Sequence, residues 1–241
     1  MGGCAYSRWK IVALAGTLGL VVSATAGLAY GSERPGSAPV AGASQSPAPT
    51  TARCAIRMLG TNGPDARNGT SAGDVIFGFA GDDIIRGLTG QDCIDAGSGN
   101  DRVTGGPDDD SLLGRSGNDR LKGEAGNDRL FGGAGSDRLD GGSGRNLVVA
   151  GSGNDRLIGG RRGRSRFFGQ SGRDRILAGS GGRNTIYAGA GNDAIIAVNR
   201  RRDRIDCGGG RDAARVDRGD RVRDCERVRR VSARRATRVH K

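Results

Sequence analysis

The sequence predicts an all-β fold, a parallel β-helix solenoid, and three observations support this prediction. A nine-residue pattern, G-G-x-G-x-D-x-U-x with U a large aliphatic residue, recurs from Gly60 almost to the C-terminus, most cleanly at residues 132–140. An aspartate returns every nine residues from Asp65 to Asp137, and from Ile76 onward an apolar residue follows it two places later. Only 4% of residues are aromatic, which excludes a large conventional core. Stacked coils with one buried aliphatic residue per repeat fit this composition.

Each copy divides into a turn and a short strand. Glycines at places one, two and four allow the backbone to turn through positive φ with no side chain in the way. The x-U-x triplet is a short strand with U facing inward. The turn's carbonyl oxygens and the aspartate at place six are the hard oxygen ligands that calcium prefers. Alternatively the aspartates only cap turns, but stacked carboxylates repel one another unless a cation lies between them, so calcium is favoured.

The copies between residues 60 and 215 resemble the RTX (hemolysin-type) calcium-binding repeats. The resemblance implies a right-handed parallel β-roll with two nonapeptides per coil. It also implies that each calcium ion lies between turns two repeats apart and takes an aspartate from each, so the paired aspartates are eighteen residues apart. Carried onto this sequence, the expected calcium ligands are Asp65, Asp74, Asp83, Asp92, Asp101, Asp110, Asp119, Asp128, Asp137 and Asp155.

Several copies depart from the pattern, and we expect weaker calcium sites there. The second glycine is replaced by Phe79, Leu88, Arg115 and Glu124, the fourth by Ala72 and Asp108, and the aspartate by Asn146. The strongest sites are expected at Asp101, Asp119, Asp128, Asp137 and Asp155.

Beyond Gly159 the pattern decays, although the coil is expected to continue. Copies of ten residues begin at Gly159, Ala178 and Ala197, and a turn can absorb the extra residue as a bulge. The apolar register continues at Ile176, Ile186, Ile195 and Ile205. Weaker candidate ligands are Asp174, Asp193, Asp203 and Asp212. About seventeen repeats predict about eight coils and a length of about 40 Å.

The ends of the chain predict export. Residues 1–29 have a short basic region and an apolar stretch too short to span a bilayer, as in a signal peptide. A retained anchor is the alternative. Residues 30–53 are expected to form a flexible Ser/Ala/Pro linker. The β-roll is expected over 54–215, with calcium sites mainly in 60–159 and degenerate arginine-rich repeats in 160–215, followed by a disulfide-closed cap over 216–228 and a basic tail over 229–241. We therefore expect a secreted protein with no transmembrane segment after signal cleavage.

Four cysteines follow the signal segment, at Cys54, Cys93, Cys207 and Cys225. An even number suggests two disulfides in an oxidising compartment, and four cysteines allow three connectivities. We expect Cys54–Cys93 and Cys207–Cys225, because each pair would brace one end of the solenoid. The alternative of a metal site is disfavoured, since the cysteines lack C-x-x-C spacing and have no histidine nearby.

Charge is divided unevenly along the chain. Residues 60–159 carry a net charge of −6, and residues 160–241 carry +14. The basic half would attract polyanions, and its candidate contact residues are Arg161, Arg162, Arg164, Arg166, Arg200, Arg201 and Arg202. An alternative function is therefore a surface adhesin-like module that binds an anionic cell-wall polymer or polysaccharide. Nucleic-acid binding as a purpose is not expected, because no aromatic residues interleave with the arginines.

We do not expect an enzyme. Residues 69–73 match the G-x-S-x-G pattern of hydrolase nucleophile elbows, but a chain with 46 glycines produces such matches by accident. The only histidine is His240, next to last, and H-E-x-x-H does not occur. A third hypothesis is a remnant regulatory module of a secreted enzyme. The leading prediction is a secreted, non-enzymatic β-roll with calcium as its cofactor.

Overall fold

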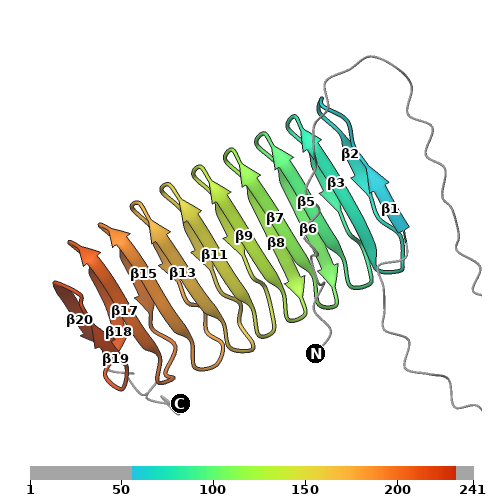
Figure 1. Ribbon diagram of the computed structural model, residues 1–241. Helices are drawn as coiled ribbons and strands as arrows, with labels where there is room; N and C mark the ends of the chain where they lie inside the picture. Colours follow the sequence, from blue (N-terminus) through green and yellow to red (C-terminus); the bar gives the residue numbers. More distant parts are fainter. Residues whose placement is uncertain (1–55, 232–241) are drawn as a thin grey trace, which may run out of the picture. The chain divides into compact units, whose positions relative to one another are not determined.

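The computed structural model describes residues 56–231, which form a solenoid of two parallel β-sheets (Figure 1). The chain alternates between the sheets, so each coil contributes one strand to each. The first sheet contains the odd-numbered strands and the second the even-numbered strands. Every pairing between strands is parallel. The expected all-β parallel solenoid is confirmed.

The strands are short, as the repeat predicts. The first sheet consists of β1 (Ile56–Leu59), β3 (Asp74–Ala80), β5 (Cys93–Ser98), β7 (Ser111–Ser116), β9 (Arg129–Ala134), β11 (Leu147–Ser152), β13 (Arg166–Ser171), β15 (Thr185–Gly191), β17 (Arg204–Gly210) and β19 (Arg221–Arg223). The second sheet consists of β2 (Ala66–Asn68), β4 (Ile84–Arg86), β6 (Arg102–Pro107), β8 (Arg120–Ala125), β10 (Arg138–Asp140), β12 (Arg156–Ile158), β14 (Arg175–Leu177), β16 (Ala194–Ala197), β18 (Ala213–Asp217) and β20 (Arg227–Val231).

The number of coils is larger than the count of nonapeptides predicts. Each sheet contains ten strands, so the solenoid has about ten coils instead of eight. The additional strands lie at the ends, where β1 precedes the first repeat and β19 and β20 follow the last. Parallel strands pair through backbone groups, so they need no glycine-rich turn to join the stack. Ten coils at about 4.8 Å each span about 45 Å.

The core is a narrow interior filled by two columns of aliphatic side chains. Leu112 of β7 pairs with Leu130 of β9, and Leu121 of β8 pairs with Leu139 of β10, so equivalent residues stack coil upon coil. All four side chains are buried. The expected continuation of this register is confirmed, since Ile176, Ile186, Ile195 and Ile205 are also buried. Each buried aliphatic side chain contributes roughly 1.5–3 kcal/mol of transfer free energy.

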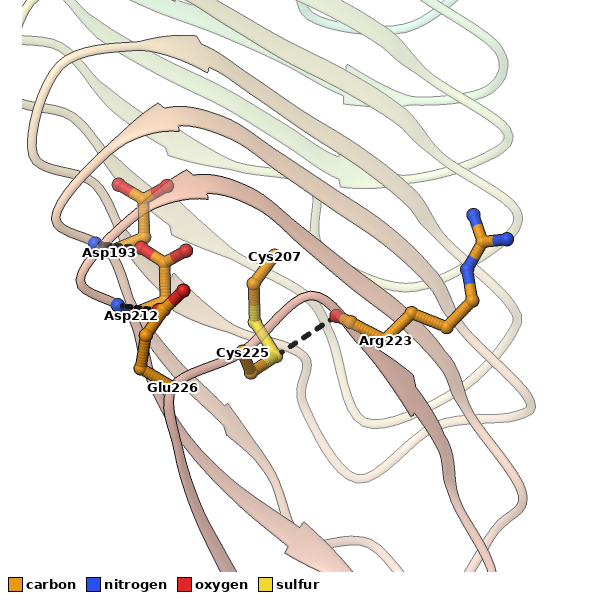
Figure 2. The surroundings of a disulfide bond; sticks show 6 residues. All are labelled: Asp193, Cys207, Asp212, Arg223, Cys225 and Glu226. Carbon is orange, nitrogen blue, oxygen red and sulfur yellow. Dashed lines mark hydrogen bonds between the residues drawn. A yellow bond between two sulfur atoms is a disulfide. The ribbon is translucent and has the colours of Figure 1, made fainter.

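The C-terminal end is closed by a disulfide between Cys207 of β17 and Cys225, whose Cα atoms are 5.2 Å apart (Figure 2). This pairing was predicted and is confirmed. Cys54 lies outside the described residues, so the Cys54–Cys93 bond stays a prediction.

The expected signal peptide over 1–29 and linker over 30–53 also lie outside the described residues, as does the tail beyond residue 231. The domain boundaries therefore stay predictions. Within residues 56–231 no helix is long and apolar enough to cross a membrane.

Candidate metal sites

The two turns of each coil bring the place-six residues into two columns, one along each edge of the solenoid. Turns that lead from the first sheet to the second carry the first column: Asp65, Asp83, Asp101, Asp119, Asp137, Asp155, Asp174, Asp193 and Asp212. Turns that lead from the second sheet to the first carry the second column: Asp74, Asp92, Asp110, Asp128, Asn146, Ser165, Asn184, Asp203 and Asp220. We call these sides of the solenoid the first edge and the second edge.

Hydrogen bonds run along each column and use only one carboxylate oxygen. The backbone N–H of Asp101 donates to Oδ1 of Asp119 at 2.9 Å, and that of Asp119 donates to Oδ1 of Asp137 at 2.8 Å. The other oxygen, Oδ2, is buried and has no hydrogen-bond partner in Asp83, Asp92, Asp101, Asp110, Asp119, Asp128, Asp137, Asp155, Asp174, Asp193 and Asp212. Burying a charged oxygen without a partner is unfavourable unless a cation compensates it.

Glycines bring other oxygen atoms close to these carboxylates. A Cβ atom at Gly114 or Gly132, the place-one residues, would overlap with Oδ2 of the aspartate in the same repeat. The same Cβ atoms would also overlap with a carbonyl oxygen one coil further along, that of Gly132 for Gly114 and that of Ala150 for Gly132. Glycine is therefore required for a close approach of carbonyl and carboxylate oxygens, the ligand chemistry that suits calcium.

Backbone carbonyls are needed because the carboxylates alone are too few. Within residues 56–231 no group of three or more His, Cys, Asp or Glu side chains is arranged to hold a metal ion. A calcium ion at either edge would therefore take aspartates of neighbouring coils together with turn carbonyl oxygens. The residues present fit such an ion, because they combine a partnerless buried carboxylate oxygen with hard neutral oxygens.

The turn conformation persists where the second glycine is replaced. Phe79, Leu88, Arg115 and Glu124 all adopt positive φ, between 75° and 83°. Asp108, at place four, has φ of 85°. A left-handed conformation is unfavourable by roughly 1–2 kcal/mol for a residue with a Cβ atom, and the adjacent coils hold these residues in it. The substitutions therefore leave the turn geometry intact, and their effect on calcium affinity stays a prediction.

Burial raises the pKa of aspartates in both columns. Desolvation raises the pKa of Asp110 to about 8, opposed by the hydrogen bond from the Asp92 backbone and reinforced by the neighbouring carboxylates of Asp92 and Asp128. Desolvation also raises the pKa of Asp119 and of Asp128 to about 7. Without a cation these carboxylates therefore hold protons at pH values where an exposed aspartate is ionised.

The first member of each column differs from the others. Oδ2 of Asp65 accepts hydrogen bonds from the backbone N–H of Thr61 at 2.6 Å and from its hydroxyl at 3.0 Å. Oδ2 of Asp74 likewise accepts from the backbone N–H of Thr70 at 2.7 Å. The hydrogen bonds from Thr61 lower the pKa of Asp65. The carboxylates of Asp65 and Asp74, both predicted ligands, thus already have partners within their own turns.

The second column is interrupted by neutral residues. Oδ1 of Asn146 accepts from the backbone N–H of Asp128 at 2.8 Å, and its amide nitrogen donates to the carbonyl oxygen of Gly141 at 2.5 Å. Asn184 donates in the same way to the carbonyl oxygen of Ala178 at 3.1 Å. Both polar atoms of the amide group therefore have hydrogen-bond partners, and no metal ion is needed at these two turns. The next two coils along this edge have Ser165 and Asn184 in place of aspartate.

The first column, in contrast, continues to the C-terminal end. Sequence reasoning treated Asp174, Asp193 and Asp212 as weak candidates because the repeat frame breaks before them. The ten-residue copies all place their extra residue in turns of the second edge, so the spacing in the first column changes from 18 to 19 while its register survives. A search for aspartates one whole coil apart, at a spacing of 18 or 19 residues, would have found Asp174, Asp193 and Asp212. Figure 2 shows the end of the column, where Oε2 of Glu226 accepts from the backbone N–H of Asp212 at 2.6 Å.

A parallel β-solenoid that stacks buried aspartates against glycine-turn carbonyls has the architecture of a calcium-binding repeat protein. The family model of the RTX calcium-binding nonapeptide repeat (4 copies) matches overlapping segments that together span residues 59–197. The chain therefore belongs to this family, and RTX nonapeptide repeats bind calcium ions. A search of curated proteins found no match to the chain.

Proposed function

We propose that this chain is a secreted, non-enzymatic protein that binds calcium along both aspartate columns and is ordered by it. The observation that carries the proposal is the row of buried Oδ2 atoms without hydrogen-bond partners. The proposed ligands are the eleven aspartates of that row, with turn carbonyl oxygens completing each site. On the first edge they run from Asp83 to Asp212, and on the second edge from Asp92 to Asp128.

Calcium binding is coupled to folding in this proposal. The ligands of one ion come from neighbouring coils and converge only when the coils are stacked, so binding free energy adds to folding free energy. The bound ion supplies the positive charge that lets adjacent buried carboxylates ionise together. We expect dissociation constants of roughly 10⁻⁴ to 10⁻³ M, typical of extracellular calcium-binding modules.

Secretion is supported by two features of the chain. Residues 1–29 have the basic start and short apolar stretch of a signal peptide. The Cys207–Cys225 disulfide suits an oxidising compartment. Secretion is tested by recovering the protein from the medium of the producing cell, and deletion of residues 2–29 should retain it inside.

A non-enzymatic role is supported by the uniformity of the columns. Each aspartate is one of many equivalents in the same backbone setting, and metal binding accounts for all of them at once. A catalytic group, in contrast, needs an environment that sets it apart from its neighbours.

The test is a calcium titration followed by far-UV circular dichroism, from metal-depleted protein to about 10 mM calcium, with magnesium as the control ion. We expect a calcium-selective gain of β signal with a midpoint between sub-millimolar and millimolar concentrations. A protein that is fully folded without calcium and does not respond to it would contradict the proposal.

A further inference from the structure

Four arginines form a column of their own on the second edge. Arg145, Arg164, Arg183 and Arg202 occupy place five of successive turns, nineteen residues apart and one per coil. All four are exposed. None of them forms an ion pair with a carboxylate within residues 56–231, where the ion pairs involve other residues. We call these four residues the arginine column.

Two further departures from the repeat coincide with this column. The residue that follows each of the first three arginines, at place six of the repeat, is uncharged. These residues are Asn146, Ser165 and Asn184. In addition, all three ten-residue copies place their longer turns here, between β12 and β13, β14 and β15, and β16 and β17. In the same coils the first edge keeps its aspartates. One edge of the C-terminal half is therefore specialised while the other follows the family pattern.

The specialised edge is hollowed. A depression of about 520 Å³ is lined by the arginine column and by Arg166 and Arg204, the first residues of β13 and β17. Asn146, Ser165, Leu147, Asn184 and Thr185 complete its lining. Six guanidinium groups therefore border one depression that runs across four coils.

Most of the charges in this depression lack a carboxylate in their own turn, because only the turn of Arg202 keeps an aspartate, Asp203. Neighbouring coils are about 4.8 Å apart, so the arginines of the column repel one another. Beside the first edge, exposed arginines such as Arg120 and Arg138, the first residues of β8 and β10, directly follow buried aspartates of the turns. The neutral residues at place six remove that carboxylate from three consecutive turns of the second edge. Bound oxyanions would relieve the repulsion, and the planar guanidinium fork pairs with carboxylate or sulfate through two hydrogen bonds.

We propose that this depression binds a linear acidic polysaccharide, with successive carboxylate or sulfate groups of the polymer paired with successive arginines of the column. The four arginines span three coil spacings, about 14 Å, which exceeds the size of a single phosphate or sulfate ion. No aromatic side chain lines the depression, so it has no platform for stacking nucleobases. The choice of a polysaccharide rests on the secretion proposed above, whereas anion binding by the column does not.

This assignment changes the residues expected to contact a polyanion. Arg164, Arg166 and Arg202, which were predicted from the sequence, line the depression. Arg204, at the end of the dense arginine cluster over residues 200–204, also lines it. Arg145 and Arg183 were missed, because they are separated from the dense arginine clusters and join them only when the coils stack. The nineteen-residue spacing that relates Arg145 and Arg183 to Arg164 and Arg202 is the signal that could have revealed them.

The test compares two quadruple variants that remove the same charge. The groove variant carries Arg145→Gln, Arg164→Gln, Arg183→Gln and Arg202→Gln. The control variant carries Arg102→Gln, Arg120→Gln, Arg138→Gln and Arg156→Gln, which are also exposed and stacked one per coil, on the second sheet. Binding of dextran sulfate and of unsulfated dextran is measured at about 150 mM salt with calcium present. Circular dichroism confirms that each variant is folded.

We expect the groove variant to bind dextran sulfate about tenfold more weakly or worse, equivalent to about 1.4 kcal/mol. The control variant should change by less than about threefold, and unsulfated dextran should not bind. A groove variant with Arg→Lys at the same four positions should bind with intermediate affinity, because lysine keeps the charge and loses the fork.

Three results would overturn the proposal. Equal losses in the groove and control variants would mean that net charge alone attracts the polymer. Full binding by the lysine variant would mean that no paired guanidinium contacts exist. A single-stranded oligonucleotide that binds more tightly than dextran sulfate, through the same four arginines, would identify nucleic acid as the occupant. Failure of the proposed secretion would be seen as absence of the protein from the culture medium. It would not change the anion affinity measured with the purified protein, so the two failures are distinguishable.

Discussion

The backbone N–H of Asp119 donates to Oδ1 of Asp137, one coil further along, at 2.8 Å, and this leaves Oδ2 of Asp137 buried without a partner. One oxygen of the carboxylate therefore connects two coils and the other is free to bind a cation. The same division recurs along both edges, so the fold and the metal sites are built from the same side chains. A substitution of one of these aspartates can therefore affect the contact between coils through Oδ1, cation binding through Oδ2, or both.

Asp137→Asn should preserve the solenoid and weaken calcium binding. The asparagine Oδ1 can still accept from Asp119, and its amide nitrogen can donate to a turn carbonyl as Asn146 does to Gly141. We expect the affinity of the adjacent sites to fall by about tenfold, or about 1.4 kcal/mol, in isothermal titration calorimetry. Asp109→Asn is the matched control, because Asp109 is exposed and its neighbours on that edge include asparagine. Equal effects of the two changes would contradict the assignment.

Asn146→Asp should extend the second column by one carboxylate. The new aspartate would lie one coil beyond Asp128 and would still accept its backbone N–H. It would lose the amide hydrogen bond to the Gly141 carbonyl, so the calcium-free protein should become less stable. Calorimetry should detect one additional bound calcium ion, and an unchanged stoichiometry would argue against the column as the binding site.

Stability in the absence of calcium should decrease as pH rises. Burial raises the pKa of Asp110 to about 8 and of Asp119 and Asp128 to about 7, above the value of about 3.9 for an unfolded aspartate. Because the folded state holds more protons, this contribution is complete below pH of about 4 and is lost between about pH 4 and 8. Urea unfolding of metal-depleted protein at several pH values measures it.

Calcium should reverse this dependence. A bound ion requires ionised carboxylates, so binding near pH 6 must release protons. Calorimetry in two buffers of different ionisation enthalpy counts those protons. Calcium affinity that stays constant from pH 6 to pH 8 would be inconsistent with the buried aspartates as ligands.

Gly135→Ala should destabilise the protein by more than about 1 kcal/mol. Gly135 has φ of 132°, and a Cβ atom there would overlap with the carbonyl oxygen of Gly117. Gly209→Ala is the control, because no atom beyond the adjoining residues lies within 4 Å of the added Cβ and φ there lies outside the left-handed region. The two free energies of unfolding should differ clearly in calcium-saturated protein.

Replacement of both Cys207 and Cys225 by alanine should destabilise the C-terminal coil by about 3 kcal/mol. The bond closes a loop with a sequence separation of 18. Because each coil contacts only its neighbours, the loss should be local. Hydrogen exchange should accelerate in β19 and β20 and remain slow in β7 to β10. Uniform acceleration along the whole solenoid would show that the last coil holds the others together.

Much of the repeating unit could be predicted from the sequence alone. The positions of the turns, the inward direction of residues such as Leu112 and Leu130, and the presence of an aspartate in each turn follow from local rules. Glycine permits positive φ, and side chains alternate across a strand whatever lies beside it. The pairing of Cys207 with Cys225 was also predicted, from their position at the end of the repeats.

Only the tertiary structure decided how the two edges differ toward the C-terminal end of the solenoid. The nine-residue frame treats every turn alike, whereas neighbours in space are one coil apart, by 18 or 19 residues. An extra residue in one turn shifts the numbering of everything that follows without shifting the strands, because backbone pairing keeps the register. For that reason Asp212 belongs to an unbroken column, Asn184 to an interrupted one, and Arg145 and Arg202 to a single depression.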